Sequence, residues 1–361
     1  MQRSLPSYPR TYRSSSPSSG ELAMSVSVAD FPQVWEKPPF TELLRCLKEL
    51  HAHPPVWNPT TPRRDIVENY HNSAQSRREV AAYLSSIIRS KLEWIEDDDE
   101  KEVLWEEASR RLSERCGRAG MGEITRRWPF ENRTGPSFQL IIREPPIVGD
   151  CLGLKTWGSS YVLARSLDEI ALKSLSHLLG SDHKGPPVNV LELGSGTGLL
   201  GMAAAALWKT SVVLTDLPDI VPNLAFNVES NRPTIESLGG SVETGALTWG
   251  RTGEDDSERF SKKNQFQVIL IADALYDENQ PELLSVAIND HIANEKDARA
   301  ILVVPLRDPA AKKLLHEFRS IAARGPRPLI CLEEHSLTGQ DDWGEGEEAA
   351  QVECWWGVFG A

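Results

Sequence analysis

The stretch NVLELGSGTGLLGMAAAALWKTSVVLTDLP, residues 189–218, constrains the fold of this chain more than any other. An apolar run ends at Leu193, a glycine-rich turn follows, and small apolar residues continue over the length of a helix. A second apolar run then ends at Asp216. Strand, turn, helix and strand in this order form a parallel βαβ unit, because a helical crossover returns the chain to the same edge of the sheet. The stretch therefore predicts an open α/β sheet with a ligand beside the turn.

Two classes of enzyme use such a unit. Dehydrogenases bind a dinucleotide there, and methyltransferases bind S-adenosylmethionine. The residues from Gly196 to Gly201 match GxGxxG, which is weak evidence by itself. In the dinucleotide fingerprint the first glycine directly follows the strand, whereas here Gly194 takes that place and the turn reads GSGTG. Glycines in this turn let the backbone approach a ligand where a Cβ would clash, and the helix that begins near Leu199 points its N–H groups at that ligand.

Asp216 ends the second strand of the unit, and its carboxylate can accept hydrogen bonds from both hydroxyls of a ribose. Dehydrogenases and methyltransferases both use an acidic residue at this place. Asp216 therefore indicates a nucleoside and does not choose between the two classes. The alternative is a purely structural role, as the N-cap of a helix that begins in LPDIVPNL.

The rest of the second half of the chain alternates between strands and helices. Helices are expected at residues 161–179, 281–293 and 310–323. Strands are expected at residues 188–193, 211–215, 241–244, 266–272 and 300–305. The last two strands, in PLICLEEHSL and AQVECWWGVFG, should form an antiparallel hairpin. The pattern predicts an α/β fold with a Rossmann-like seven-stranded sheet, mostly parallel, and a terminal antiparallel hairpin.

The first part of the chain differs in composition and divides it into regions. Residues 1–30 are expected to be a disordered tail. The first 20 residues are rich in Ser, Pro and Arg, a composition that a transit peptide shares, but Pro6, Pro9 and Pro17 oppose the amphipathic helix that such a peptide needs. Residues 31–136 are expected to form a mainly helical N-terminal region, in which the acidic run EWIEDDDEKEVLWEE starts a helix. Residues 137–361 begin with the strand-like SFQLIIRE and are expected to form the α/β domain.

Four separated motifs choose between the two chemistries. They are GLKTWGSSYVLA, LELGSGTGLLG with TDLP, LTWG, and QVILIADALYD, which ends at the carboxyl edge of the sheet. In this order they resemble the seven-β-strand lysine methyltransferases that modify non-histone proteins, and D-x-x-Y is a hallmark of that family. Overall the chain resembles most the fungal members that methylate translation elongation factors. The resemblance covers about residues 137–361, and an N-terminal extension is similar to that of the elongation-factor branch.

The resemblance implies S-adenosyl-L-methionine as cofactor and a protein lysine as acceptor. It places Trp157 against the methionine end of the cofactor, Asp216 on the ribose and Trp249 beside the adenine. An aromatic ring suits adenine, although either tryptophan alone could equally be a core residue. The remaining implied contacts come from the turn of Gly194, Ser195 and Gly196, and from the backbone of Ala272. Trp355 and Trp356 have no place in a motif and are interpreted as packing residues.

Asp273 and Tyr276 of DALY are the candidate catalytic residues. A free lysine has a pKa of about 10.4, so the acceptor amine must lose its proton and be held in line for transfer. Asp273 is expected to accept a hydrogen bond from the amine and to orient its lone pair. Its charge raises the pKa of the amine, so a role as base is secondary. Tyr276 is expected to line the lysine channel.

Composition limits the partners. The net charge of −13 disfavours nucleic acid and suits a basic protein partner. The five cysteines form no CxxC pair, which predicts neither a zinc site nor a disulfide framework. With no apolar run of about 18 residues and no secretory signal, the chain is expected in the cytoplasm and away from membranes.

Other interpretations remain open at this point. The chain could methylate a small molecule or another side chain, it could be an inert methyltransferase fold that serves as an interaction module, or it could be a dehydrogenase. A further hypothesis concerns the acidic stretch TGQDDWGEGEE, residues 338–348, between the last two strands. It could steer a basic acceptor toward the site, or it could only be a solvated loop that protects the hairpin from aggregation.

Overall fold

The structure is a computed structural model of the whole chain. It describes residues 28–51, 78–115, 122–133, 135–146, 152–180, 185, 187–250, 256–325, 327–339 and 352–360. Most of the acidic stretch between the last two strands, including Asp341, Asp342, Glu345, Glu347 and Glu348, lies outside the described residues. So does the N-terminal tail up to residue 27.

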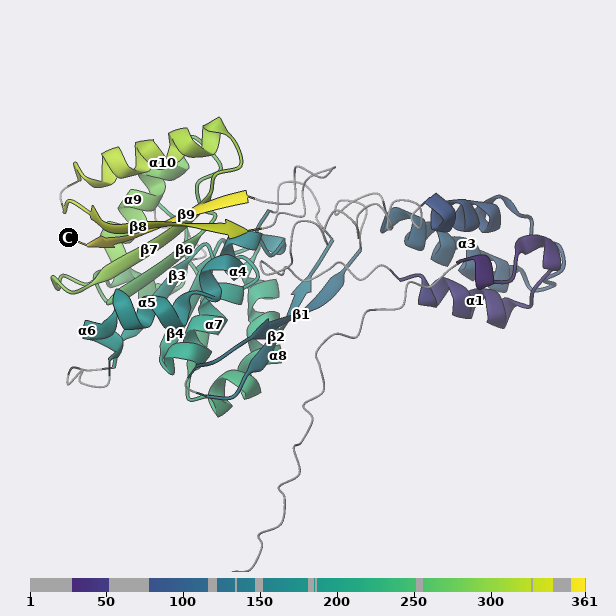
Figure 1. The fold of residues 1–361 in the computed structure, drawn as a ribbon, viewed down its shortest axis with the longest axis horizontal. Helices are drawn as coiled ribbons and strands as arrows, with labels where there is room; N and C mark the ends of the chain where they lie inside the picture. Colours follow the sequence, from purple (N-terminus) through teal and green to yellow (C-terminus); the bar gives the residue numbers. More distant parts are fainter. Residues whose placement is uncertain are drawn as a thin grey trace, which may run out of the picture.

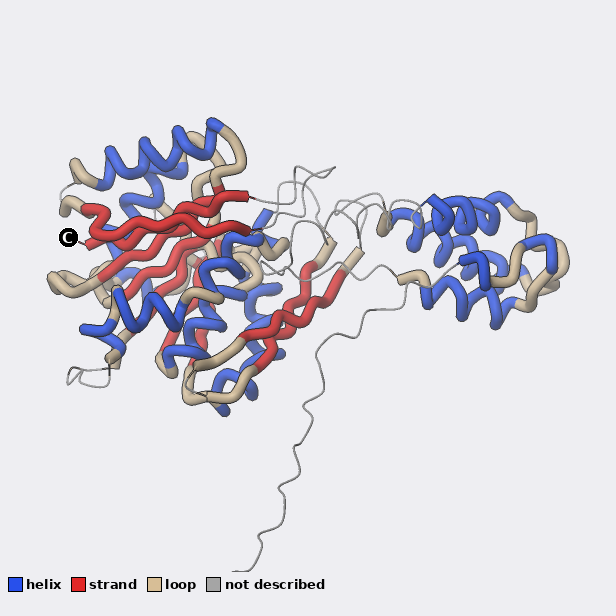
Figure 2. The backbone as a smooth tube through the Cα atoms, viewed as in Figure 1, coloured by secondary structure: helices blue, strands red, loops and turns tan. Residues whose placement is uncertain are grey.

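Seven strands form one sheet in the order β5-β4-β3-β6-β7-β9-β8 (Figures 1 and 2). The first five in this order are parallel, and β9 is antiparallel to its neighbours β7 and β8. The expected fold, a mostly parallel sheet with a terminal antiparallel hairpin, is confirmed. The strands are β3 (Asn189–Leu193), β4 (Ser211–Asp216), β5 (Ser241–Ala246), β6 (Val268–Ala272), β7 (Arg299–Pro305), β8 (Ile330–Gly339) and β9 (Val352–Gly360).

Helices cover both faces of the sheet, because alternate residues of its buried strands point to opposite sides. One face packs under α4 (Gly158–Ala164), α5 (Leu167–Lys173), α6 (Ser176–Leu179), α7 (Leu199–Trp208) and α8 (Val221–Ser237). The other packs under α9 (Gln280–His291) and α10 (Pro309–Ala322). The interpretation of Trp355 and Trp356 as packing residues is confirmed, because both are buried in β9. Trp356 packs in the core under α4–α8, and Trp355 packs in the core under α9 and α10.

The prediction of one continuous helix over residues 161–179 was wrong. This segment is divided into α4, α5 and α6, with breaks at residues 165–166 and 174–175. At the first break the hydroxyl of Ser166 donates to the backbone carbonyl of Val162 over 3.3 Å, and the carbonyl of Leu167 accepts from the indole of Trp208 over 3.0 Å. Serine hydroxyls compete with helical hydrogen bonds in this way, so the apolar periodicity continues where the helix does not.

Two further strands, β1 (Ile124–Phe130) and β2 (Phe138–Glu144), form a separate antiparallel hairpin. The expected boundary between residues 136 and 137 falls between them. Only β2 was predicted, because ITRRWPF combines two arginines and a proline and resembles a loop. In the structure its residues alternate between buried and exposed. Arg126 is buried on the same face as Ile124 and Trp128, and Arg127 is exposed on the other face.

A ladder of three asparagines attaches the hairpin to α8. The side chain of Asn231 accepts from the N–H of Ile141 and donates to its carbonyl, both over 2.7 Å. Asn227 makes the same pair of bonds with Arg143, over 2.9 and 3.1 Å, and Asn223 also donates to the carbonyl of Arg143. All three asparagines are buried. Buried amides require such partners, so the ladder satisfies the edge of β2 that faces the helix.

The N-terminal helices have a hydrophobic cluster of their own, and in Figure 1 they lie apart from the sheet. They are α1 (Phe40–Glu49), a helix over residues 78–89, and α3 (Asp98–Ser113). The acidic run begins α3 as its composition suggests. Asp97 is the N-cap, and its carboxylate accepts from the N–H of Asp99 over 2.8 Å. Across the described part of the chain, no helix has both the length and the apolar character that a membrane crossing requires.

Candidate active site

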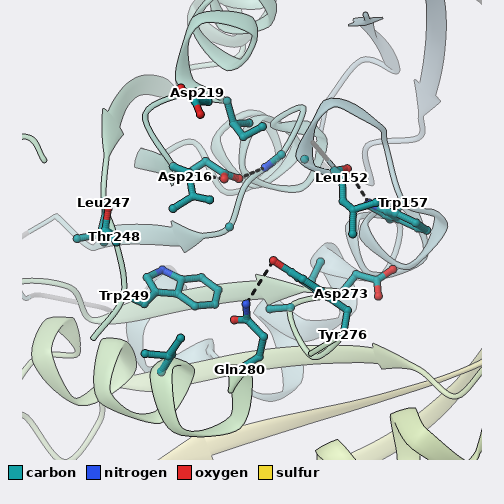
Figure 3. Close-up of a pocket in the computed structure, with 18 of the residues that line it drawn as sticks. Leu152, Trp157, Asp216, Asp219, Leu247, Thr248, Trp249, Asp273, Tyr276 and Gln280 are labelled. Atoms are coloured by element: carbon teal, nitrogen blue, oxygen red, sulfur yellow. Dashed lines mark hydrogen bonds between the residues drawn. The ribbon is translucent and has the colours of Figure 1, made fainter. Parts of the chain in front are cut away.

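A cavity of about 450 Å³ lies at the carboxyl ends of β3, β4, β6 and β7 (Figure 3). Open α/β sheets bind ligands at this edge, and the volume falls within the range of small-molecule sites. The strand order brings the ends of β4 and β6 to either side of β3. The cavity is lined by Leu152, Gly153, Trp157, Gly194, Gly196, Asp216, Leu217, Asp219, Ile220, Leu247, Thr248, Trp249, Ala272, Asp273, Ala274, Tyr276, Gln280, Leu283 and Arg307.

The glycine turn forms the floor of the cavity between β3 and α7. Gly196 has a φ of +56°, and a Cβ there would lie 3.2 Å from the backbone oxygen of Gly153. Gly198 begins α7 with a φ of +87°, where a Cβ would lie 2.7 Å from the side chain of Leu224. Both positions combine a left-handed backbone with tight packing, so only glycine fits without strain. The turn therefore presents backbone rather than side chains to the cavity.

Asp216 lies beside this turn, at the end of β4. One carboxylate oxygen accepts from the N–H of Gly196 over 2.7 Å, and the other accepts from the N–H of Leu217 over 2.8 Å. Burial raises the pKa of this carboxyl, and the two backbone hydrogen bonds oppose that shift. A carboxylate has about four lone-pair positions, so each oxygen keeps capacity for one hydroxyl of a ligand.

Two tryptophans lie on opposite sides of the cavity, as Figure 3 shows. Trp249 follows β5, and its ring lies so close to Gly194 that a Cβ there would be 3.3 Å away. Trp157 precedes α4, and its indole N–H donates to the carbonyl of Leu152 over 3.1 Å. The cavity thus offers an apolar aromatic surface at each side of the polar turn.

Asp273 comes directly after β6 and has a φ of +57°. Asp tolerates this left-handed conformation better than most residues. Its N–H still bonds to the carbonyl of Val303 over 3.1 Å, so the position is fixed against β7. The carboxylate accepts two hydrogen bonds from the guanidinium of Arg307, over 2.9 and 2.7 Å, and one from the hydroxyl of Ser159 over 3.0 Å. The sequence did not predict this ion pair.

Tyr276 lies at the mouth of the same cavity and is 59% exposed. Its hydroxyl accepts from the side-chain amide of Gln280 over 3.3 Å, as the dashed line in Figure 3 shows. Desolvation, followed by the charges of Asp216 and Asp277, raises the pKa of its phenol. The hydroxyl is therefore a neutral hydrogen-bonding group at the entrance.

The structure brings together in one cavity every predicted site residue except Ser195. The N–H of Ser195 donates to the carbonyl of Thr215 over 2.8 Å, and the hydroxyl of Ser195 accepts from the N–H of Thr215 over 3.0 Å. Ser195 therefore ties β3 to β4 beneath the turn. Arg307 was missed, although it follows β7 at the same edge of the sheet. Ligands of open α/β sheets bind at the carboxyl ends of the strands, and a search of the residues after every parallel strand would have found Arg307.

The arrangement has two chemically different halves. The half around the glycine turn, Asp216 and Trp249 suits a ligand that carries vicinal hydroxyls and an aromatic ring system. The half around Asp273, Arg307 and Tyr276 offers a paired carboxylate, a guanidinium and a phenol near the surface. A binding cavity that joins such halves can hold one molecule deeply and present its reactive end to another from solvent.

Comparisons with known proteins agree with this geometry. A family profile described as lysine methyltransferase matches residues 136–320. Protein-lysine N-methyltransferase rrg1 of Schizosaccharomyces pombe is 30% identical over 285 residues, which cover 79% of this chain and 84% of the relative. Protein-lysine N-methyltransferase EFM2 of Saccharomyces cerevisiae is 36% identical over 252 residues, or 67% of this chain and 56% of that protein. Protein-lysine methyltransferase METTL21E of mouse is 28% identical over 200 residues, covering 55% of this chain and 71% of the relative.

Proposed function

The chain belongs to the lysine methyltransferase family, and from this premise we propose that it uses S-adenosyl-L-methionine to methylate a lysine of a translation elongation factor. The observation that carries the proposal is that Asp216 and Trp249 line the same cavity as Asp273 and Tyr276. This supports a nucleoside site and an acceptor site that adjoin at one edge of the sheet.

The residues of the cavity fit the proposed cofactor. The glycine turn gives the close backbone approach that the amino-acid end needs, since a Cβ at Gly196 would meet the backbone of Gly153. Asp216 would hold the ribose hydroxyls, Trp249 would flank the adenine and Trp157 would lie against the methionine end. Ala272 would contribute a backbone contact. When bound, the cofactor supplies an activated methyl group on a sulfonium centre.

The chain's own residues would prepare the acceptor. Tyr276, exposed at the mouth, would line the channel that admits the lysine side chain. Asp273 would accept a hydrogen bond from the amine and direct its lone pair into the cavity, and would afterwards stabilise the charged product. Holding the reacting groups in line contributes several kcal/mol to lowering the barrier. Asp273 is well suited to this because its backbone is fixed against β7.

The choice of an elongation factor rests on the resemblance described above and on charge. A protein of net charge −13 attracts a basic partner. Such an acceptor works in the cytoplasm, which is the compartment we propose for this enzyme.

Incubation with methyl-labelled S-adenosylmethionine tests the proposal. The acceptors are a cell lysate and purified, unmethylated elongation factors, and mass spectrometry maps the label. We expect label on one lysine of an elongation factor, and its loss when that lysine is changed to arginine. Label only on small molecules would support the other acceptor class. Calorimetric binding of the cofactor without any transfer would support the inert module instead.

A further inference from the structure

The ion pair between Asp273 and Arg307 is the feature of the site that the proposed function does not yet use. Both nitrogens at the end of the guanidinium reach the carboxylate, one to each oxygen, over 2.9 and 2.7 Å. The carboxylate side chain is 7% exposed, and that of Arg307 is 30% exposed. The guanidinium also lies 5.0 Å from the ring centroid of Trp157. Two-point contact and stacking fix the guanidinium beside the proposed path of the amine.

The charge of this pair matters because the acceptor must arrive as a neutral amine. An unbalanced carboxylate within about 4–6 Å of a lysine would raise the pKa of the lysine by about 1–3 units and keep it protonated. A guanidinium keeps its charge at every pH at which proteins work. Paired with Arg307, Asp273 can still accept a hydrogen bond while the pair carries no net charge.

Other charged and titratable groups also face the cavity. Asp216 ends β4, Asp219 follows it three residues later, and Tyr276 follows β6. Lys155 does not line the cavity; it is buried, and its ammonium lies 4.8 Å from the centroid of the Trp157 ring. Asp273 and Arg307 complete the set. The first three titratable groups belong to the cofactor half or the entrance. Arg307 contacts the carboxylate that we propose to meet the amine.

We infer that Arg307 is a positioning residue that neutralises Asp273, so that the acceptor lysine can give its proton to water before transfer. This inference rests on the proposed function of the site. In the absence of the guanidinium, the carboxylate would hold the acceptor as an ammonium ion. Binding of the protonated lysine would then improve while turnover declined, because the bound nitrogen would have no free lone pair.

Arg307→Gln and Arg307→Lys separate charge from packing. The pH dependence of kcat is measured with the acceptor protein at saturating cofactor. In Arg307→Gln we expect the acidic limb of the profile to move to higher pH by about one unit. Arg307→Lys keeps the charge, so its limb should stay near that of the parent even if the rate falls. Arg307→Met removes the charge but keeps an apolar stem over Trp157, and must show the same shift as the glutamine variant.

Affinity for an unmodified lysine peptide gives a readout that does not depend on turnover. Measured at pH 7, it should be several-fold tighter in Arg307→Gln and Arg307→Met than in the parent. Arg319→Gln is the matched control, because it removes a guanidinium that pairs with Glu334 over 2.8 Å at an exposed site. It should leave both the acidic limb of the kcat profile and the affinity for the lysine peptide unchanged.

An unshifted limb with weaker peptide binding would overturn the inference, since loss of packing alone lowers the rate equally at all pH values. The inference also fails if Arg307→Lys shifts as far as Arg307→Gln. These results differ from failure of the proposed function, in which the parent itself would transfer no methyl group to a protein lysine.

Discussion

The carboxylate of Asp216 accepts a hydrogen bond from the backbone N–H of Gly196 over 2.7 Å, which ties together the ends of two adjacent strands. The same carboxylate lines the cavity, so it shapes the turn and is also the proposed ligand of the ribose. Any substitution of Asp216 therefore changes two things at once, and the choice of variant has to separate them.

Asp216→Ala should weaken binding of S-adenosylmethionine by about 1.5–3 kcal/mol, because two charge-assisted hydrogen bonds to the ribose are lost. Asp216→Asn keeps an oxygen that can accept from Gly196 but replaces the other acceptor with a donor, so it should also bind weakly. Calorimetry measures both affinities, and thermal unfolding of the unliganded proteins shows whether the turn is intact. A well-folded asparagine variant with parental affinity would contradict the ribose assignment.

Asp273→Asn should remove most of the methylation activity and leave cofactor affinity close to that of the parent. Asparagine tolerates the left-handed backbone at this position, whereas alanine would add strain to the loss of the carboxylate. Activity is measured as turnover on the acceptor protein, with cofactor binding measured separately by calorimetry. A parental turnover number would exclude the orienting role. Ser159→Ala removes a single hydrogen bond to the same carboxylate and should have a smaller effect.

The stability of the protein should fall as pH rises from about 5 to 8, in part because of Glu192. Burial raises the pKa of this carboxyl to about 8. In that pH range the folded protein keeps the proton and the unfolded chain has released it, so the folded state binds more protons. The free energy of unfolding then decreases by up to about 1.4 kcal/mol per pH unit from this group. Glu192→Gln should remove this part of the slope.

Urea unfolding of the parent and the Glu192→Gln variant at several pH values measures the difference. The glutamine oxygen can still accept from the N–H of Gly201, which bonds to Glu192 over 3.1 Å. The two free energies of unfolding should therefore diverge with increasing pH in favour of the variant. Parallel curves would show that Glu192 is ionised in the folded protein throughout the range.

Asn227→Ala should lower the free energy of unfolding by about 2–4 kcal/mol. Its amide bonds to the backbone of Arg143 and also donates to the carbonyl of Thr197 in the glycine turn over 3.1 Å. The substitution leaves these buried backbone groups without the side chain that satisfies them. Ser230→Ala, an exposed position on the same helix, is the control and should change stability little. Equal unfolding midpoints for both variants would contradict a stabilising ladder.

The sheet could be predicted because its strands are apolar, short and bounded by clear turns. The site followed from the sheet, since Asp216 and Asp273 end strands whose carboxyl ends share one edge. Arg307 was not predicted because the end of β7 was not searched for site residues, as the ends of β4 and β6 were. Strand β1 was missed because its arginines and proline obscure the alternation, and the asparagines of α8 were missed because their partners are backbone groups distant in sequence.

The asparagine ladder also fixes the number of residues that α8 must have between the positions that bond to β2. Four helical residues rise about 6.0 Å and two strand residues advance about 6.6 Å, so Asn231 and Asn227 match Ile141 and Arg143. Two residues past Arg143, just beyond the end of β2, Pro145 has no N–H, and Asn223 instead accepts from the side chain of Arg143 over 3.1 Å. Deleting one helical residue between Asn227 and Asn231 would rotate one of these side-chain amides about the helix axis by about 100°, away from the strand. Within this interval the chain can exchange exposed side chains, but an insertion or deletion would detach the hairpin from the helix.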